Sequence, residues 1–391
     1  MRAEPPEGET ARDVLRAVRR AIDGPGPAVL LGGGSGGVGS AGGGSAGGVE
    51  VPAGTAAIVV TSGSTGYPKS VVLGRDALVT SAFATSARIG EGAWLLALPP
   101  GYVAGLQVLV RSLMAGHEPA MLEGPFQPRA FVAAARLMTS SVGGRDLPRY
   151  TSLVPAQLLR LLDAADDPEV RAALTSFEAI LVGGQALPRP VHERAAALGA
   201  RIVRTYGSSE TSGGCVYDGA PLDGVGVRIE GGEVQVRGPM LATEYLDDPE
   251  RTAAAFVRDA AGVRWYRTGD AGEFSGGMLR VIGRLDNVIV SGGVNVSLDR
   301  VERIVRGLPG LASAVVVAVP DERWGEASVV VLTGSPSPDD TALLERVRAA
   351  VAAEIGAPAR PSRLVRVAEL PHLPGGKPDR RAIRSLVAPV G

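Results

Sequence analysis

From residue 56 onward, short β-rich runs alternate with amphipathic helical stretches, and this alternation is the feature that most constrains the fold. Runs typical of strands occupy residues 57–60, 70–73, 94–97, 151–154, 179–182 and 201–205. Stretches with helical spacing occupy residues 76–88, 103–114, 128–138, 155–163 and 188–198. Such alternation predicts a layered α/β fold with a largely parallel sheet.

Two later regions differ from this pattern. Residues 225–282 contain short alternating runs with glycine turns, which predict a small antiparallel section. We place a domain boundary at Asp286, giving a large domain over residues 1–285 and a small α/β domain over residues 286–391. In the small domain, helical stretches are expected at 301–308 and 341–355 and strands at 314–319 and 328–332.

The N-terminal part contains a predicted helix over residues 12–22 and a low-complexity segment. In residues 32–48, 11 of 17 positions are glycine, which predicts a flexible surface loop. The segment includes a formal GxGxxG pattern. More glycine follows where a dinucleotide-binding motif requires a helix, so we do not interpret it as a cofactor site.

Composition excludes several classes of function. The formal net charge of −1 argues against a general nucleic-acid or membrane-surface binder. The single cysteine, Cys215, excludes an internal disulfide and is typical of a reducing compartment. The first twenty residues lack the apolar segment of a signal peptide, and no apolar run is long enough to predict a membrane helix. We expect a cytoplasmic protein, and a homodimer stays open.

Only two of the 40 basic residues are lysines, Lys69 and Lys377. An ammonium is a compact point charge that can meet a phosphate or carboxylate oxygen end-on, whereas a guanidinium is a broad planar fork. Because the chain uses arginine everywhere else, we interpret the two lysines as answers to a specific local requirement. The alternative is that a biased composition left two ordinary lysines behind.

Lys69 ends the string Thr61-Ser-Gly-Ser-Thr-Gly-Tyr-Pro-Lys69, which follows a predicted strand. Its glycines allow close approach of the backbone, and its serine and threonine hydroxyls and amides can bind the oxygens of a polyphosphate. It is not a Walker A loop, because no Gly-Lys-Ser/Thr ends it. A serine-rich turn that binds nothing is the alternative.

Two further strings carry groups typical of a nucleotide site. The string Arg204-Thr-Tyr-Gly-Ser-Ser-Glu-Thr211 follows a predicted strand and offers an aromatic ring, hydroxyls and a carboxylate on one loop. The tyrosine could stack on a purine, and the glutamate could hold a magnesium ion that bridges phosphates. Asp270 is a typical acceptor for ribose hydroxyls, and Arg284 could reinforce that contact. For each string, an ordinary turn is the alternative.

Taken in this order, the strings resemble the adenylate-forming superfamily of acyl-CoA and aryl-CoA ligases, luciferases and carrier-loading adenylation domains. The resemblance runs from about residue 56 to the end. Further matches are Val182-Gly-Gly184, Ser291-Gly-Gly-Val-Asn295, Val319-Pro-Asp-Glu-Arg-Trp-Gly-Glu326 and Leu370-Pro-His-Leu-Pro-Gly-Gly-Lys377. Within the superfamily, Leu98-Pro-Pro-Gly-Tyr-Val-Ala-Gly-Leu-Gln107 and residues 205–218 look like the o-succinylbenzoate–CoA ligases of menaquinone biosynthesis.

The resemblance implies that ATP and a carboxylic acid form an acyl-adenylate, which coenzyme A converts to a thioester. It implies that Tyr206 stacks on adenine, which the backbone of Gly183 and Gly184 approaches. Asp270 and Arg284 would bind the ribose, and Glu210 would hold Mg²⁺. The residues implied for the phosphates are Thr61, Ser62, Gly63, Ser64, Thr65, Gly66, Lys69 and Ser209.

The resemblance also implies that the small domain is mobile. Lys377 would be the catalytic lysine, because a placed cation stabilises negative charge that develops on phosphate oxygens in the transition state. Asp286 would be the hinge about which the small domain rotates between the two half-reactions. The residues that the rotation would bring to the CoA tunnel are Ser291, Gly292, Gly293 and Asn295.

By the same resemblance, the acid pocket would be lined by Tyr102, Val103, Gly105, Pro155, Gln157, Gln185, Ser212, Gly213, Gly214 and Cys215. o-Succinylbenzoate has a second carboxylate, and an unpaired buried charge is costly, so the pocket should offer a hydrogen-bond donor or a cation. Gln157 and Gln185 are candidates, although either could be an ordinary polar residue at the end of a helix or strand. We expect Cys215 to pack rather than react, and the three histidines have no metal or triad spacing.

Two positions depart from the family pattern: many relatives have histidine where this chain has Gly101, and asparagine where it has Arg204. From the matched strings together, we expect an ATP-, Mg²⁺- and CoA-dependent ligase whose acid is o-succinylbenzoate. The alternatives are a ligase for another aryl or acyl acid, with CoA or a carrier protein as acceptor, and an inactive nucleotide-binding relative.

Overall fold

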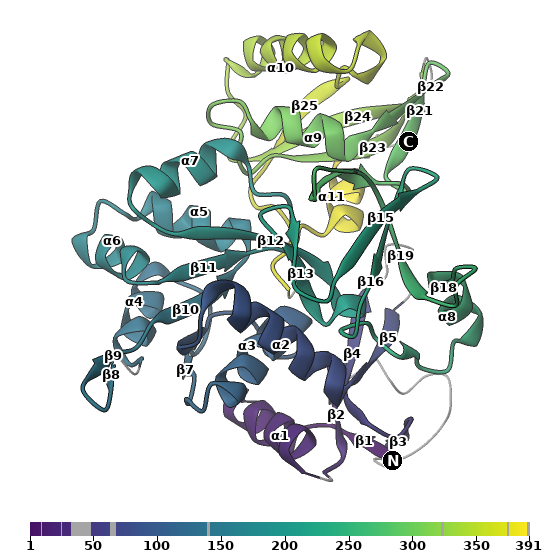
Figure 1. Cartoon of the computed structure of the whole chain (residues 1–391). Helices are drawn as coiled ribbons and strands as arrows, with labels where there is room; N and C mark the ends of the chain where they lie inside the picture. Colours follow the sequence, from purple (N-terminus) through teal and green to yellow (C-terminus); the bar gives the residue numbers. More distant parts are fainter. Residues whose placement is uncertain are drawn as a thin grey trace.

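The computed structural model describes residues 1–8, 10–24, 26–32, 48–62, 68–138, 141–321, 324–373 and 375–388. Most of the glycine-rich segment lies outside these ranges, so the loop predicted there is not described. The described residues form two large sheets, a smaller antiparallel sheet and a C-terminal sheet (Figure 1).

The first large sheet is parallel over most of its width. Its order is β14-β13-β12-β11-β10-β6-β7, and it is parallel from β12 to β7. The strands are β6 (Ala93–Leu96), β7 (Ala120–Met121), β10 (Arg149–Leu153), β11 (Ala179–Val182), β12 (Ile202–Ser208), β13 (Gly213–Tyr217) and β14 (Ala220–Pro221). The predicted α/β layers with a largely parallel sheet are therefore confirmed.

Both faces of this sheet are covered, as the continuous apolar strands require. In β11, Ala179 and Leu181 enter one core, whereas Ile180 and Val182 enter another on the opposite face. The first core also contains residues of α1 (Ala11–Asp23), α2 (Arg75–Ile89) and α3 (Val103–Met114). The second contains residues of α4 (Pro128–Arg136), α5 (Pro155–Asp163), α6 (Pro168–Thr175) and α7 (Arg189–Ala197).

The second large sheet has the order β17-β5-β4-β2-β1-β3 and is mixed. Its strands are β1 (Arg2–Glu4), β2 (Ala28–Leu31), β3 (Val49–Glu50), β4 (Thr55–Ser62), β5 (Pro68–Gly74) and β17 (Glu244–Tyr245). Antiparallel pairing of β4 with β5 sets Thr61 opposite Lys69. The phosphate-binding string thus starts and ends on neighbouring strands.

The predicted antiparallel section is confirmed as a third sheet. Its strands are β15 (Gly226–Glu230), β16 (Glu233–Arg237), β18 (Phe256–Arg258), β19 (Arg264–Ser275) and β20 (Met278–Arg284), with α8 (Pro249–Ala255) beside them. All of its pairings are antiparallel. A separate hairpin joins β8 (Ser141–Val142) to β9 (Arg145–Asp146).

The C-terminal sheet contains β21 (Val288–Ser291), β22 (Val294–Ser297), β23 (Val315–Asp321), β24 (Gly325–Thr333) and β25 (Arg363–Val367). Apolar residues of α9 (Leu298–Arg306) and α10 (Asp340–Glu354) share one core with β23, and those of α11 (Arg380–Val387) share the other. A 3₁₀ turn spans Ala357–Ala359. Helix α9 begins three residues earlier than predicted, because the Ser297 side chain accepts from the N–H of Arg300 and caps it.

One local prediction is wrong. The Arg204–Thr211 string was expected to form a loop after a strand, but β12 continues to Ser208, and only η1 (Ser209–Thr211) is a turn. The reason is antiparallel pairing with β13, in which Tyr206 lies opposite Val216 and Gly207 opposite Gly214. Gly207 permits this approach, since a Cβ there would lie 2.0 Å from the carbonyl oxygen of Gly213.

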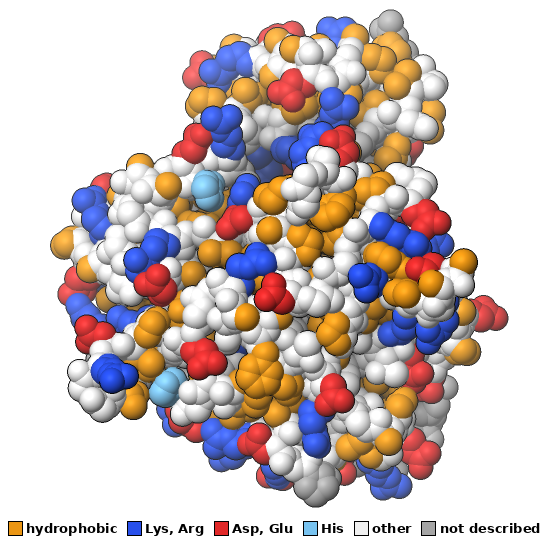
Figure 2. Space-filling model, viewed as in Figure 1, with side chains coloured by type: hydrophobic (Ala, Val, Ile, Leu, Met, Phe, Trp, Pro, Cys, Tyr) orange, Lys and Arg blue, Asp and Glu red, His pale blue; other side chains and the backbone are white. Residues whose placement is uncertain are grey.

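No helix within the described ranges is long and apolar enough to cross a membrane. Basic and acidic side chains are interspersed over the face shown in Figure 2, in agreement with the near-zero net charge.

Candidate active site

The carboxylate and the arginine predicted at the ribose face each other across one hairpin. The register of β19 and β20 sets Asp270 opposite Arg284. Arg284 Nη1 lies 3.5 Å from Asp270 Oδ1, and the hydroxyl of Tyr206 donates to Asp270 Oδ2 over 2.6 Å. Of the residues assigned to adenine and ribose, Tyr206 and Arg284 therefore both contact Asp270.

The environment of this group keeps the tyrosine protonated. Burial raises the pKa of Asp270, while the hydrogen bond from Tyr206 and the charge of Arg284 oppose that rise. Burial, with the nearby Asp270 charge, holds the pKa of Tyr206 well above its usual value. Tyr206 is thus a stable hydrogen-bond donor that fixes the orientation of Asp270.

Glu210 lies on η1, at the end of β12, and only 2% of the residue is exposed. The Lys69 ammonium, from β5, makes an ion pair and a hydrogen bond with Glu210 Oε1. The Tyr245 hydroxyl donates to the same oxygen over 2.8 Å. Tyr245 is missing from the sequence prediction, because a strand of only two residues has no periodicity by which to find it.

The charge of Glu210 is maintained by these partners. Burial by itself raises the pKa of a carboxyl group, but the ammonium of Lys69 and the hydroxyl of Tyr245 outweigh it, and the pKa of Glu210 is lowered. The pKa of Tyr245 is raised, chiefly by burial and then by the Glu210 charge, so its hydroxyl stays a donor. Glu210 is therefore a buried, ionised carboxylate.

A single carboxylate of this kind fits a magnesium ion. Mg²⁺ in nucleotide sites is commonly bound by one or two carboxylates, substrate phosphates and water. The described part of the chain holds no group of three or more His, Cys, Asp or Glu side chains that could form a protein-only metal site. Glu210 thus suits a metal that arrives with a nucleotide better than a permanently bound ion.

Lys377 reaches this region from the small domain. It lies on a turn next to Gly376 and is exposed, and a Cβ on Gly184 would lie 3.5 Å from its Cε. The protein atoms around it lower its pKa by desolvation, whereas the charges of Glu210 and Asp270 raise it. The turn therefore brings a cation to where the charges of both carboxylates act on it.

The same turn also touches the predicted acid pocket. A Cβ on Gly375 would lie 3.5 Å from the ring of Tyr102, and one on Gly376 would lie 3.1 Å from Val154 Cγ2. Gly184 has a φ of +80°, a backbone conformation that favours glycine. At Gly183, just after β11, a Cβ would lie 2.3 Å from Thr205 Oγ1 and 3.1 Å from the Thr205 carbonyl oxygen, so a larger residue there would displace Thr205.

Within the predicted acid pocket, Gln157 is committed to the backbone. Its Oε1 accepts from the N–H of Val154 over 3.1 Å, and its Nε2 donates to the carbonyl of Ala97 over 2.9 Å. This is the ordinary helix-end role that the sequence left open. Gln185 is half-buried, and no described residue hydrogen-bonds to its side chain.

At the other predicted pocket residues, neighbouring segments of the chain pack closely against the backbone. Ser212 has a φ of +52°, and its hydroxyl donates to the carbonyl of Met240. A Cβ on Gly213 would lie 3.1 Å from Gln107 Cγ and 4.0 Å from Val103 Cγ2, so α3 packs directly on this strip. Gly105 lies in the first turn of α3, where a Cβ would meet the carbonyl oxygen of Pro99 at 2.2 Å.

The residues assigned to the hinge and the CoA tunnel lie in different places. Asp286 binds the Arg284 guanidinium with both carboxylate oxygens, each at 3.0 Å. The predicted hinge therefore contacts the predicted ribose group. Ser291 and Asn295 lie on the β21–β22 hairpin, whose two-residue turn is Gly292-Gly293, with φ of +56° and +80°.

Several predicted or unusual residues take no part in these contacts. Gly63, Ser64, Thr65 and Gly66 lie outside the described residues, as does the side chain of Ser62. Arg204 forms a half-exposed ion pair with Asp218, at 2.8 Å. Cys215 is buried, and burial raises its pKa to about 12, as expected for a packing residue.

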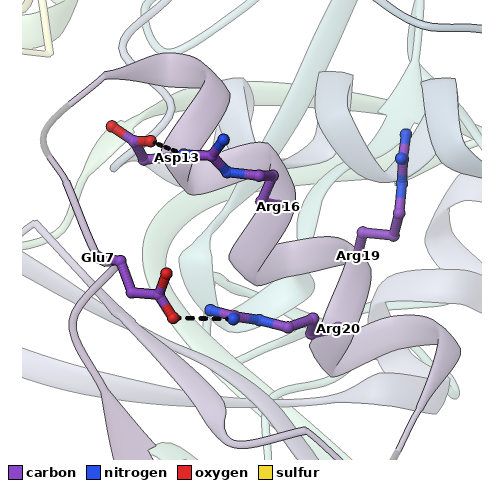
Figure 3. Close-up of a pocket in the computed structure, with 5 residues that line it drawn as sticks. All are labelled: Glu7, Asp13, Arg16, Arg19 and Arg20. Atoms are coloured by element: carbon purple, nitrogen blue, oxygen red, sulfur yellow. Dashed lines mark hydrogen bonds and ion pairs between the residues drawn. The ribbon is translucent and has the colours of Figure 1, made fainter.

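A surface hollow of about 230 Å³ lies elsewhere, on α1 (Figure 3). Two ion pairs lie within the hollow, Arg16 with Asp13 and Arg20 with Glu7 at 2.9 Å, whereas its Arg19 pairs with Glu118 outside it. It contains none of the residues assigned to the nucleotide or the acid.

Comparisons with known proteins identify the family of the chain. The family model described as "AMP-binding enzyme" matches residues 47–246, and "AMP-binding enzyme C-terminal domain" matches residues 300–377. A probable 2-succinylbenzoate–CoA ligase of Mycobacterium tuberculosis is 39% identical over 398 residues, covering 97% of this chain and 96% of that protein.

Solved structures point the same way. The o-succinylbenzoate CoA synthetase of Bacillus subtilis, in complex with the acyl-adenylate intermediate OSB-AMP, is 25% identical, with a TM-score of 0.69 over 84% of this chain and 69% of that one. The amide bond synthetase McbA of Marinactinospora thermotolerans is 27% identical, with a TM-score of 0.72 over 99% of this chain and 80% of that one.

Proposed function

The chain belongs to the family of AMP-binding enzymes, and we propose that it is an AMP-forming ligase that joins o-succinylbenzoate to coenzyme A. One structural observation carries the chemistry: Lys377 of the small domain lies over Gly184, where the charges of Glu210 and Asp270 raise its pKa against desolvation. The acid is inferred from the relative that is 39% identical and matched over 96% of its length.

In the first half-reaction, the acid carboxylate attacks the α-phosphate of ATP and pyrophosphate leaves. Two anions must meet, so a cation that contacts the developing charge stabilises the transition state more than the ground state. Lys377 supplies this cation, and its exposed turn lets it reach both reactants. Tyr206 and Asp270 hold the nucleoside, and Lys69 neutralises phosphate oxygens.

Mg²⁺ bound by Glu210 would offset phosphate charge when the nucleotide is present. The chain's own contribution is to keep Glu210 ionised and its carboxylate fixed, through the contacts of Lys69 and Tyr245. Gln185 is the candidate donor for the second carboxylate of o-succinylbenzoate, because Gln157 is already committed to the backbone.

For the second half-reaction, the small domain would rotate about Asp286. This rotation would bring the segment Ser291–Asn295 next to the thiol of CoA. The position of Asp286 between the third sheet and the C-terminal sheet supports this rotation. Asp286 contacts Arg284 at the end of the third sheet and precedes β21 of the small domain. The boundary between domains at Asp286 is part of this proposal.

The test measures pyrophosphate release with ATP, Mg²⁺, CoA and o-succinylbenzoate, with benzoate and a medium-chain fatty acid as comparisons. We expect release with o-succinylbenzoate, together with its CoA thioester in the mass spectrum. Activity with another acid alone would keep the ligase chemistry and reject this substrate. Absence of release with every acid of a broad panel, despite ATP binding, would favour an inactive nucleotide-binding protein.

The likeness to an amide bond synthetase over 99% of the chain supports a second candidate, in which an amine replaces CoA as the acceptor. Running the same assay in parallel with CoA and with amines as the acceptor distinguishes the two. An amide in the mass spectrum without thioester formation would select the second candidate.

A further inference from the structure

Tyr245 is a buried phenol that joins the two large sheets at the charged part of the site. It lies on β17, at the edge of the six-stranded sheet, where it pairs with Val71 of β5. Lys69 lies on the same strand β5, whereas Glu210 comes from the end of the seven-stranded sheet. Only 4% of Tyr245 is exposed.

The side chain of Tyr245 contacts both charged groups. Its hydroxyl donates to Glu210 Oε1 over 2.8 Å and lies 3.5 Å from the Lys69 ammonium. The Lys69 Nζ also lies 5.1 Å from the centroid of the ring, within the range of a cation–π contact. One phenol thus fixes an ammonium by its face and a carboxylate by its hydroxyl.

The position of Tyr245 is itself held from several sides. Its N–H donates to Thr252 Oγ1 over 2.9 Å, and its ring packs on Phe256 with centroids 5.9 Å apart. Phe256 packs in turn on Tyr266, with centroids 5.2 Å apart. A side chain held in this way can impose its geometry on a longer, more flexible partner such as a glutamate.

The residues before Tyr245 bind η1, the turn that contains Glu210. The N–H of Ala242 donates to the carbonyl of Glu210 over 2.8 Å. Arg264 donates to the carbonyls of Ala242 and Thr243 over 2.8 and 2.7 Å. The segment over residues 242–245 therefore fastens both the backbone and the side chain of Glu210.

We propose that Tyr245 is a positioning residue for nucleotide binding: through its hydrogen bond to Oε1, its hydroxyl holds the Glu210 carboxylate in the orientation that would receive the metal of a metal–nucleoside triphosphate. When phosphate draws the Lys69 ammonium away from Glu210, the hydroxyl is the partner that stays. A buried carboxylate that loses every partner is costly, and without Tyr245 it would have to reorient or recruit water. This inference rests on the proposed function only in that ATP is a substrate.

The test compares Tyr245→Phe with Tyr150→Phe by calorimetric titration of ATP in the absence of acid and CoA. Tyr245→Phe keeps the ring and its cation contact and removes only the hydroxyl. Tyr150 is a matched control, since it is also buried and donates one hydrogen bond over 2.8 Å, to the carbonyl of Ile89. Each variant is titrated once with Mg²⁺ and once with EDTA.

We expect Tyr245→Phe to weaken binding of Mg²⁺–ATP about tenfold, the size of one lost hydrogen bond to a charged group. Binding with EDTA should match the unaltered protein, and Tyr150→Phe should bind normally in both conditions. In a Glu210→Gln background, Tyr245→Phe should add no further loss.

An unchanged Mg²⁺–ATP affinity in Tyr245→Phe would overturn the inference. An equal loss with Mg²⁺ and with EDTA would do the same, because it would indicate general damage. Because no acid is present, a wrong acid leaves the result intact. Failure of the unaltered protein to bind ATP would instead reject the nucleotide site itself, together with both proposals.

Discussion

The two lysines of the chain lie in opposite surroundings, although both point to the same nucleotide site. Lys69 is fixed on a strand and paired with the buried Glu210. Lys377 lies on an exposed turn that the hydrogen bond from the N–H of Leu373 to its carbonyl closes, and no described residue makes a hydrogen bond or an ion pair with its ammonium. A cation that already has a partner contributes to the structure of the empty site, whereas one without a fixed partner can meet the reactants and leave again.

This contrast predicts that removing each lysine affects a different property of the protein. Loss of Lys377 should affect the rate of one chemical step. Loss of Lys69 should also affect the stability of the folded protein, because a buried carboxylate loses its counter-charge.

The largest effect is expected for Lys377→Ala. Adenylation should fall by about 10² to 10³-fold, the usual loss when one group that stabilises developing charge is removed. The CoA step, started from supplied acyl-adenylate, should be nearly unchanged. Pyrophosphate exchange measures the first step and thioester formation the second. Arg381→Ala removes an exposed cation close by as a control; equal loss of both steps in Lys377→Ala would contradict the contrast.

The next effect concerns the stability of Lys69→Met. Breaking a buried pair by removing one partner costs about 3 kcal/mol at the lower end of the usual range, which suits a lysine that is partly exposed. The free energy of unfolding from urea titration measures this. In the exposed pair of Arg136 and Glu169, Arg136→Met should cost at most about 1 kcal/mol. The double variant Lys69→Met, Glu210→Met should recover part of the loss, and no recovery would argue against an ion-pair origin.

A smaller effect is expected in the pH dependence of adenylation. Desolvation by the surrounding protein atoms lowers the pKa of Lys377, and the lysine is a cation only below that pKa. Adenylation should therefore decline as pH rises, and at a lower pH than a solvated lysine with a pKa of about 10.4 would give. The rate of pyrophosphate exchange against pH measures this limb. In whatever activity Lys377→Arg retains, the decline in adenylation should move to higher pH. An unchanged decline would show that another group causes it.

The smallest effect is expected for the stability of Lys69→Arg. The charge opposite Glu210 is kept, so the free energy of unfolding should change by about 1 kcal/mol or less. Affinity for Mg²⁺–ATP should nevertheless fall, since a guanidinium fork cannot take the place of a point charge between a carboxylate and a phosphate. Urea unfolding and calorimetry measure the two quantities. Unchanged affinity would support the view that the lysine is a chance survivor of composition.

Much of the fold follows from local patterns. Alternation of apolar runs predicted the central strands and helices, and glycine turns predicted the antiparallel sheet. The short strands β1, β3 and β17 were not predicted, because two or three residues carry no periodicity and are strands only through their partners. The end of β12 was misplaced for the same reason, since pairing with β13 decides it.

The candidate site divides in the same way. Tyr206, Asp270 and Arg284 were assigned from strings, and the structure brings them into contact. Gln157 was a candidate for the acid, but its amide is used by the backbone of Val154 and Ala97. That commitment depends on Ala97, which lies 60 residues away and cannot be read from the sequence around Gln157. The roles of the remaining residues, including the hinge at Asp286, stay predictions.

The sequence by itself determined which chemical groups are available and on which kind of element each lies. The hydroxyls, the glycines and the two lysines can be read directly from short strings of the sequence. Only the tertiary structure decided which groups meet: Lys69 and Glu210 are 141 residues apart and come from different sheets, and Tyr245 joins them from a third segment. The physical reason is that strand pairing and sheet packing set distances between side chains, whereas residue type and periodicity describe only one segment at a time.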